Sequence, residues 1–367
     1  MSEIECVDLF CGAGGLTFGL NAEGVNVVAG IDVDELCRHP FEVNNSSVFV
    51  NKDVSVLTGA ETNSLFTGAS RIKVLAGCAP CQPFSTYSQR YDTVGTPRWG
   101  LLYKFGHIAK ELRPDIITME NVPTVARHAV FDDLIATLKS AGYDIFHEVI
   151  DCSTYGLPQG RKRTVLLASL HGPIELIPQT HKKPRTVRQA LSKLPHLNAG
   201  ETNTKDPLHR SASLSDLNLE RIKASIPGGT WRDWPEHLVA ECHRRESGKT
   251  YPGVYGRMEW DAPSPTLTTQ FYGFGNGRFG HPEQDRAISL REGAILQGFP
   301  RTYSFIPKGQ PVQFTSLGRL IGNAVPVTLG RIIGRSINLH LGTASKTNKK
   351  TSVNGETTSG RARALVA

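Results

Sequence analysis

The chain has 367 residues, of which 39% are hydrophobic and 20% charged, so it can bury at least one large core and is long enough for two domains. Its formal net charge of +7 is compatible with a polyanionic partner, although many ordinary proteins are mildly basic. Seven cysteines without a framework pattern argue against a disulfide scaffold. The acidic start argues against a signal peptide, and the lack of an apolar run of membrane-spanning length argues against a membrane protein. Together these features favour a soluble, intracellular, cytoplasmic protein.

The first half of the chain alternates apolar runs typical of strands with helical patterns, which predicts an α/β fold with a parallel sheet. A parallel sheet places the carboxyl ends of its strands at one edge, where ligands bind. The expected strands are 4–10, 25–31, 74–76, 116–119, 143–150 and 164–169, and the expected helices are 16–22, 101–112 and 130–140.

The second half is less regular, because prolines, glycines and polar loops dominate from 173 to about 280. Helical patterns return at 289–297 and at 329–341. The residues after 342 are rich in Ser, Thr, Gly and Asn. These changes predict a catalytic and cofactor-binding domain over 1–170 and 281–342, a smaller irregular domain over 171–280, and a disordered basic tail over 343–367.

A glycine-rich turn from Asp8 to Gly15 follows the first expected strand. Glycines let a backbone bend sharply and approach a ligand closely. The dinucleotide pattern G-x-G-x-x-G fits imperfectly, because Thr17 stands in place of the third glycine. Asp32 ends the second strand, where a carboxylate can accept both hydroxyls of a ribose, and Asp53 could accept from an adenine amino group. The turn therefore favours binding of the nucleoside of a cofactor over binding of a pyrophosphate. The alternative is a tight turn that binds no ligand.

A cysteine-containing turn, from Gly77 to Ser85, follows the strand expected at 74–76. Its prolines stiffen the loop, so a thiol there is held as a nucleophile needs to be. Cys78 and Cys81 could instead be half of a zinc site, a redox pair or two ordinary buried thiols. The chain has no second Cys-x-x-Cys or Cys-x-x-His pair, and proline disfavours the helix that a redox pair should open.

Two further groups of polar residues flank expected strands. Glu120 follows the strand at 116–119 and therefore falls on the same sheet edge as Cys81. Arg161 and Arg163 precede the strand at 164–169, and strand alternation points both to one side, where they could hold a phosphate or a carbonyl oxygen. The ordinary alternative for Glu120 is a loop glutamate paired with a nearby arginine. The ordinary alternative for Arg161 and Arg163 is that both are exposed to solvent at the start of the strand.

Taken in order, these motifs resemble those of the cytosine-C5 DNA methyltransferases. The resemblance covers nearly the whole chain apart from the irregular middle and the tail. Six motifs in the same order are highly specific, although any one of them could arise by chance. They are Asp8 to Gly15, Pro80-Cys81-Gln82, Glu120-Asn121-Val122, Gln159 to Arg163, Arg286 to Pro300 and Gly322 to Pro326.

The resemblance implies a Rossmann-like domain that uses S-adenosylmethionine, with no metal. Cys81 would attack C6 of cytosine, and Glu120 would hydrogen-bond N3 and the exocyclic amine. Arg163 would reach O2 of the base, with Arg161 supporting the same site and Cys78 packing beside it. The matching cofactor-lining positions are Asp8, Phe10, Gly12, Gly14, Gly15, Asp32, Asp53, Leu102, Asn323 and Val325.

The resemblance also implies double-stranded DNA as the partner, a flipped-out target base and a target-recognition role for 171–280. A monomer is expected, with a separate cognate restriction endonuclease as a further partner. The loop from Gln82 to Trp99 would close over the base, and Thr268 and Gln270 would contact the orphaned strand. The candidate DNA contacts are Ser85, Gln89, Arg90, Arg98, Thr268 and Gln270.

Two departures from the family pattern are visible. Ala79 stands where many members carry a first proline, and Trp99 stands where members often have arginine. The rival interpretations are an RNA cytosine methyltransferase on this fold, a catalytically silent DNA-binding regulator and a nicotinamide oxidoreductase. The intact set of Cys81, Glu120 and Arg163 disfavours the silent regulator, and the broken glycine pattern disfavours the oxidoreductase.

Overall fold

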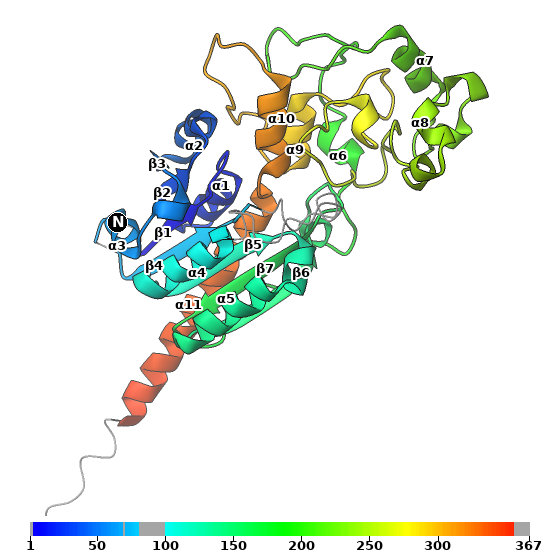
Figure 1. Cartoon of the computed structure of the whole chain (residues 1–367). Helices are drawn as coiled ribbons and strands as arrows, with labels where there is room; N and C mark the ends of the chain where they lie inside the picture. Colours follow the sequence, from blue (N-terminus) through cyan, green and yellow to red (C-terminus); the bar gives the residue numbers. More distant parts are fainter. Residues whose placement is uncertain (1–2, 69, 81–99, 356–367) are drawn as a thin grey trace, which may run out of the picture.

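A seven-stranded sheet forms the centre of the larger part of the molecule (Figure 1). The computed structural model describes residues 3–68, 70–80 and 100–355. The strand order is β3-β2-β1-β4-β5-β7-β6, and β7 runs antiparallel to the six other strands, so the expected mostly parallel α/β sheet is confirmed. The strands are β1 (Ile4–Leu9), β2 (Asn26–Asp32), β3 (Val48–Asn51), β4 (Ile72–Gly77), β5 (Ile116–Asn121), β6 (Asp144–Asp151) and β7 (Lys162–Ser169).

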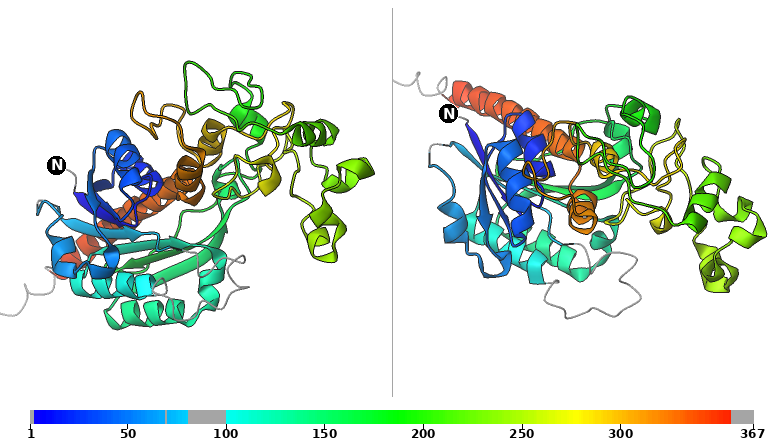
Figure 2. Two further views of the ribbon diagram at one scale, coloured as in Figure 1. Left: turned by 45° about the horizontal axis from the view of Figure 1, so that its top comes forward. Right: turned by 90° about the horizontal axis from the view of Figure 1, so that it is seen from above.

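Helices cover both faces of this sheet (Figure 2). Alternate residues of one strand enter different cores: Leu9 of β1 joins the core under α4 and α5, whereas Cys6 joins the core under α1 and α11. This burial on both faces explains why the strands read as continuous apolar runs. The covering helices are α3 (Gly59–Asn63), α4 (Gly100–Leu112) and α5 (Ala129–Ser140) on one face, and α1 (Gly15–Ala22) and α11 (Val327–Gly355) on the other.

A close helix contact anchors the end of the chain to its beginning. A Cβ atom built on Gly19 of α1 would lie 2.5 Å from the carbonyl oxygen of Val327, and one built on Gly330 would lie 2.6 Å from that of Leu16. Only glycine permits this approach of the two backbones. α1 and α11 therefore pack directly against each other beneath the sheet.

The smaller part of the molecule is built mainly from loops and short helices (Figure 1). Its backbone pairing in the described residues consists of isolated bridges rather than strands. Its helices are α6 (Val187–Leu191), α7 (Asp216–Ala224), α8 (Glu241–Arg244), α9 (Leu290–Leu296) and α10 (Phe314–Asn323). The irregular character expected for 171–280 is thus present, and the domain boundaries themselves stay predictions.

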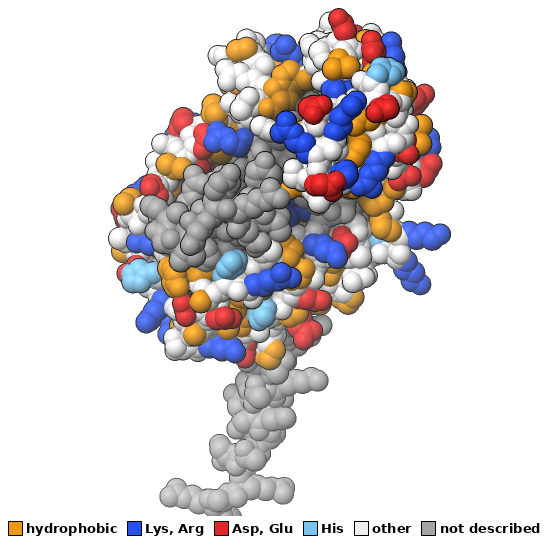
Figure 3. Space-filling view, turned by 45° about the vertical axis from the view of Figure 1, so that its right-hand side comes forward, with side chains coloured by type: hydrophobic (Ala, Val, Ile, Leu, Met, Phe, Trp, Pro, Cys, Tyr) orange, Lys and Arg blue, Asp and Glu red, His pale blue; other side chains and the backbone are white. Residues whose placement is uncertain are grey.

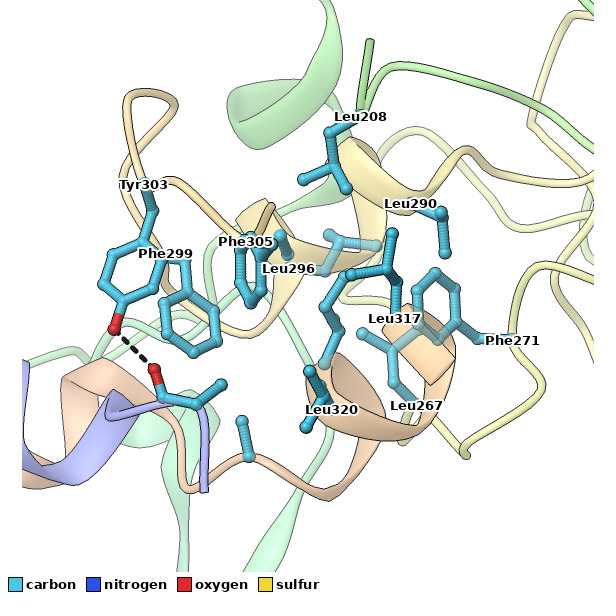
Figure 4. Close-up of a cluster of buried hydrophobic side chains, with 14 of the residues drawn as sticks. Leu208, Leu267, Phe271, Leu290, Leu296, Phe299, Tyr303, Phe305, Leu317 and Leu320 are labelled. Atoms are coloured by element: carbon cyan, nitrogen blue, oxygen red, sulfur yellow. Dashed lines mark hydrogen bonds between the residues drawn. The ribbon is translucent and has the colours of Figure 1, made fainter. Parts of the chain in front are cut away.

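α9 and α10 pack with the irregular region rather than with the central strands of the sheet. Their residues Leu296 and Leu317 share one apolar cluster with Leu267 and Phe271 (Figure 4). Val325, just before α11, already belongs to the core beneath the sheet, and the expected boundary at 281 stays a prediction. The same cluster also includes Phe41 of α2 (Arg38–Asn45), which joins the two parts through one core.

The last helix extends beyond the end expected at 341, and the disordered tail expected over 343–367 stays a prediction. α11 continues to Gly355, and 356–367 lie outside the described residues. No helix in the described part of the chain is long and apolar enough to cross a membrane.

Candidate active site

The carboxyl ends of the parallel strands bring the sequence motifs together at one edge of the sheet. The glycine turn follows β1, Asp32 ends β2, and the cysteine turn follows β4. Glu120 and Asn121 end β5, which lies beside β4. The sheet therefore places the candidate cofactor residues and the candidate catalytic residues side by side, as expected for an open α/β sheet.

Asp32 fixes the glycine turn by hydrogen bonds to the backbone. Its Oδ2 accepts from the Gly12 amide at 3.0 Å, and its Oδ1 accepts from the Asp34 amide at 2.9 Å. Phe10 has φ 61° and Gly12 has φ 53°, so the backbone turns through the left-handed region at both residues. A Cβ on Gly12 would meet no atom within 4 Å, which leaves open space above the turn.

Asp8 lies beneath this turn and has one oxygen without a partner. Its Oδ2 accepts from the Thr17 hydroxyl at 2.7 Å, so the residue in the third-glycine position holds a buried carboxylate. Its Oδ1 is buried and makes no hydrogen bond with the described residues. The pKa of Asp8 is raised from 3.8 to about 7, mainly by burial; the hydrogen bond from Thr17 opposes this rise, and the nearby carboxylate of Asp32 adds to it.

The first and last motifs meet at this turn. A Cβ on Gly15 would lie 2.2 Å from the carbonyl oxygen of Val325, so the two backbones are in direct contact. Val325 and Leu102 are buried, Phe10 is half-buried, and Asn323 is exposed at the end of α10. Gly14, with φ 84°, packs against Asn45 and Tyr303.

These residues fit a nucleoside cofactor such as S-adenosylmethionine. Open space above Gly12, a half-buried aromatic ring at Phe10 and the orphaned Oδ1 of Asp8 all belong to the same turn. Asp53 is exposed farther along the sheet edge, where its Oδ1 accepts from the Ser55 amide. The described residues contain no group of three or more His, Cys, Asp or Glu that could hold a metal ion.

Glu120 lies at the centre of the candidate catalytic residues and is only 2% exposed. Its Oε2 is 3.4 Å from Nε of Arg163. Glu120 pairs with Val165 in the antiparallel ladder, so Arg163, two residues away on β7, points to the same face. The distance marks an ion pair but no hydrogen bond, and Oε2 is a buried acceptor that has no hydrogen-bond partner among the residues that the structure describes.

Cys78 contacts Glu120 from the opposite neighbouring strand. Its Sγ donates a hydrogen bond to Oε1 of Glu120 at 3.2 Å. The sequence predicts only that Cys78 packs beside the site, and the hydrogen bond could not be inferred without the pairing of β4 with β5. Among the described residues, Glu120 is thus held between a thiol and a guanidinium.

Asn121 is a further residue whose role the sequence analysis missed. Its Nδ2 donates to the carbonyl oxygen of Ala79 at 3.1 Å, and its Oδ1 accepts from the Val122 amide. It therefore fixes the backbone two residues before Cys81. The position of Asn121 in the Glu-Asn-Val motif is the feature of the sequence that could have indicated this role.

Arg161 is placed differently from Arg163. Its guanidinium donates to the carbonyl oxygens of Leu267 and Gly322, each at 3.2 Å, and also to Oε1 of Gln159. These bonds join the sheet-bearing part to the irregular region and to α10. Arg161 therefore binds carbonyl oxygens of its own chain. A contact between Arg161 and the substrate stays a prediction.

The remaining candidates for DNA contact cannot all be located. Thr268 and Gln270 are exposed, close to the Leu267 carbonyl that Arg161 binds. Figure 3 shows Lys and Arg side chains on both parts of the molecule, interspersed with acidic ones. The nucleophile candidate and four DNA-contact candidates lie outside the described residues: Cys81, Ser85, Gln89, Arg90 and Arg98.

The fold and the site define an α/β enzyme with a glycine turn that fits a nucleoside and a buried carboxylate–guanidinium pair at the same sheet edge. The chain belongs to the C-5 cytosine-specific DNA methylase family, whose sequence profile matches residues 4–339. It is therefore a DNA methyltransferase of the cytosine-C5 type, and the resemblance of the six motifs is confirmed.

Known relatives agree with this assignment. The type II methylase M.HgiDII of Herpetosiphon aurantiacus is 52% identical over 328 residues, covering 88% of this chain and 92% of that protein. The type II methyltransferase M.Sau96I of Staphylococcus aureus is 30% identical over 328 residues, covering 88% and 73%.

Solved structures show the same fold. A DNA modification methyltransferase encoded within an Escherichia coli prophage superimposes with a TM-score of 0.72 at 23% identity, covering 92% of this chain and 99% of that one. The methyltransferase EhMeth of Entamoeba histolytica superimposes with a TM-score of 0.64 at 18% identity, covering 93% and 99%.

Proposed function

We propose that this enzyme transfers a methyl group from S-adenosylmethionine to C5 of a flipped-out cytosine within a short duplex DNA sequence. The observation that carries the proposal is the buried Oε2 of Glu120 beside Arg163, which accepts no hydrogen bond from any residue in the described part of the chain. A buried acceptor without a hydrogen bond is costly, and a donor on a bound base would satisfy it. The exocyclic amine of cytosine is such a donor.

The chain supplies the groups that activate the base. C5 of cytosine is a weak nucleophile until a thiolate adds to C6, so Cys81 would form a bond from Sγ to C6 while the 5,6 double bond breaks. Glu120 would accept a hydrogen bond from the exocyclic amine and, carrying a proton on its other oxygen, donate one to N3, and Arg163 would donate to O2. Electron density displaced by the thiolate would thus be stabilised across the ring.

Methyl transfer then completes the sequence. S-adenosylmethionine, when bound, supplies a methyl group on a positively charged sulfur. C5 would bond to the methyl carbon as the bond from that carbon to sulfur breaks, which leaves S-adenosylhomocysteine. The C5 proton would then leave to a base, and the Cys81–C6 bond would break to restore the double bond. The turn at Gly12 and Asp32 would hold the nucleoside portion, and Val325 would line the same space.

DNA recognition falls to the irregular region in this proposal. Residues 171–280 would act as the target-recognition domain, with Thr268 and Gln270 contacting the orphaned strand. The loop with Ser85, Gln89, Arg90 and Arg98 would contact phosphates and the groove. The enzyme would act as a monomer beside a separate restriction endonuclease, and the naming of relatives as type II enzymes agrees with the restriction-modification setting.

The proposal is tested by expressing the protein in a host that lacks 5-methylcytosine and sequencing the DNA by a cytosine-methylation-sensitive method. We expect 5-methylcytosine at one short recurring sequence. A Cys81→Ser variant should bind S-adenosylmethionine normally and leave the DNA unmodified. Host DNA without 5-methylcytosine, or full modification by the variant, would overturn the proposal.

A further inference from the structure

The position of Cys78 is fixed by strands on both sides. Its amide donates to the carbonyl oxygen of Leu9 at 3.2 Å, which continues the pairing of β4 with β1. On the other side, Gly77 pairs with Met119, so the next residue along each strand, Cys78 and Glu120, lie beside each other. Neighbouring residues in a parallel pair project to the same face. The sheet register therefore brings this thiol to the carboxylate.

The thiol and the guanidinium divide the two carboxylate oxygens between them. Cys78 donates to Oε1 at 3.2 Å, whereas Oε2 lies 3.4 Å from Arg163 and makes no hydrogen bond with the described residues. A glutamate side chain has three rotatable bonds, and contacts on both oxygens restrict the plane of its carboxylate. A thiol is a weak donor, so it can hold Oε1 while Oε2 remains the better acceptor for a bound base.

We propose that Cys78 is a positioning residue for Glu120, which keeps the carboxylate oriented so that Oε2 can receive the base. This inference rests on the proposed function of Glu120. Cys78 would form no bond to the substrate, and its contribution would pass entirely through the Glu120 carboxylate. Simple packing against Glu120, the ordinary role of a small buried thiol, predicts different behaviour for the substitutions below.

The test uses steady-state methyl transfer to DNA that carries the sequence modified by the wild-type enzyme. Cys78→Ala removes the donor and should lower kcat by about three- to tenfold, the effect of losing one modest hydrogen bond. The KM values for DNA and for S-adenosylmethionine should change by less than about twofold. Cys78→Ser replaces the thiol with a hydroxyl donor and should restore most of kcat.

Two controls separate positioning from packing. Cys6→Ala makes the same change in the core under α1, remote from Glu120, and should lower the melting temperature without lowering kcat. In a Glu120→Gln background, Cys78→Ala should have little further effect on the remaining activity, because both changes act through one carboxylate. Melting temperatures measured for every variant show whether a loss of activity reflects unfolding.

Each outcome decides the inference. A loss of kcat in Cys78→Ala that serine rescues and that disappears in the Glu120→Gln background supports it. Unchanged kcat in Cys78→Ala, failure of serine to rescue, or an undiminished effect in the Glu120→Gln background overturns it. If the wild-type enzyme transfers no methyl group at all, the proposed function itself falls, and this inference falls with it.

Discussion

The hydroxyl of Tyr303 donates a hydrogen bond to the carbonyl oxygen of Ala13 at 2.6 Å (Figure 4). Ala13 lies in the glycine turn after β1, whereas Tyr303 follows α9 in the second half of the chain. Tyr303 also packs against Phe299 and Phe305, with ring centroids 4.6 and 5.1 Å away. The apolar cluster of the smaller part thus supports the candidate cofactor turn directly.

Tyr303→Phe should weaken cofactor binding and lower stability. Loss of the hydroxyl leaves the buried Ala13 carbonyl without this donor, so we expect a loss of about 1 kcal/mol in the free energy of unfolding and a lower affinity for S-adenosylmethionine. Urea unfolding and calorimetric titration measure the two effects. Tyr143→Phe is the matched control, because its hydroxyl binds the Pro114 carbonyl instead and should cost stability without changing cofactor affinity.

The pH dependence of stability should carry a contribution from Asp8. Its pKa is 3.8 in the unfolded chain and about 7 in the fold, so the folded state binds the extra proton between these values. Stability contributed by Asp8 is therefore fully present below about pH 4 and is lost as the pH rises toward 7.

The Asp8→Asn variant isolates this contribution, because it removes the titrating group. The free energy of unfolding of the variant minus that of the wild type should increase between about pH 4 and pH 7. Urea unfolding at several pH values measures this difference. A difference that stays constant across this range would contradict the raised pKa of Asp8.

Arg161 and Arg163 should respond differently to the same substitution. Arg161→Met removes charged hydrogen bonds to two buried carbonyls, of Leu267 and Gly322, and should lower the free energy of unfolding by about 3 kcal/mol. Arg163→Met should mainly lower kcat, by about a hundredfold or more, because it removes the cation beside Glu120. Unfolding curves and steady-state kinetics for both variants distinguish the roles, and the opposite assignment would refute this division.

The contact between α1 and α11 should be sensitive to one methyl group. Gly19→Ala would place a Cβ 2.5 Å from the Val327 carbonyl oxygen and should destabilise the fold by more than about 1 kcal/mol. Gly342→Ala lies on α11, the partner helix in this contact, with no atom within 4 Å of the added carbon, and should be neutral or slightly stabilising. Equal melting temperatures for the two variants would contradict the close packing.

The fold was largely predictable from local sequence patterns, because buried strands such as β4 and β5 are apolar and end at glycine or polar residues. The position of β7 between β5 and β6 was not, because strand order depends on contacts between distant residues. The packing of α9 and α10 against Leu267 and Phe271 was likewise hidden. An amphipathic helix pattern shows that one face is buried but not which element buries it.

The candidate site was predictable to a similar extent. Glu120 and Arg163 could be named from their motifs, and the structure brings them together. The hydrogen bonds of Cys78 to Glu120 and of Arg161 to Gly322 could not be predicted, since they depend on strand register and on the approach of residues far apart in the chain. Short motifs identify residue types, whereas only the fold shows the partner of each side chain.

The central claim, that Cys81 adds to the target base, is tested most directly by covalent trapping. The enzyme is incubated with S-adenosylmethionine and duplex DNA in which 5-fluorocytosine replaces the cytosine that the wild-type enzyme methylates. Fluorine cannot leave C5 as a proton does, so we expect a stable protein–DNA adduct whose mass includes the transferred methyl group, linked through Cys81, and no adduct with Cys81→Ser. Absence of an adduct from the active wild-type enzyme, or linkage through another residue, would contradict the account.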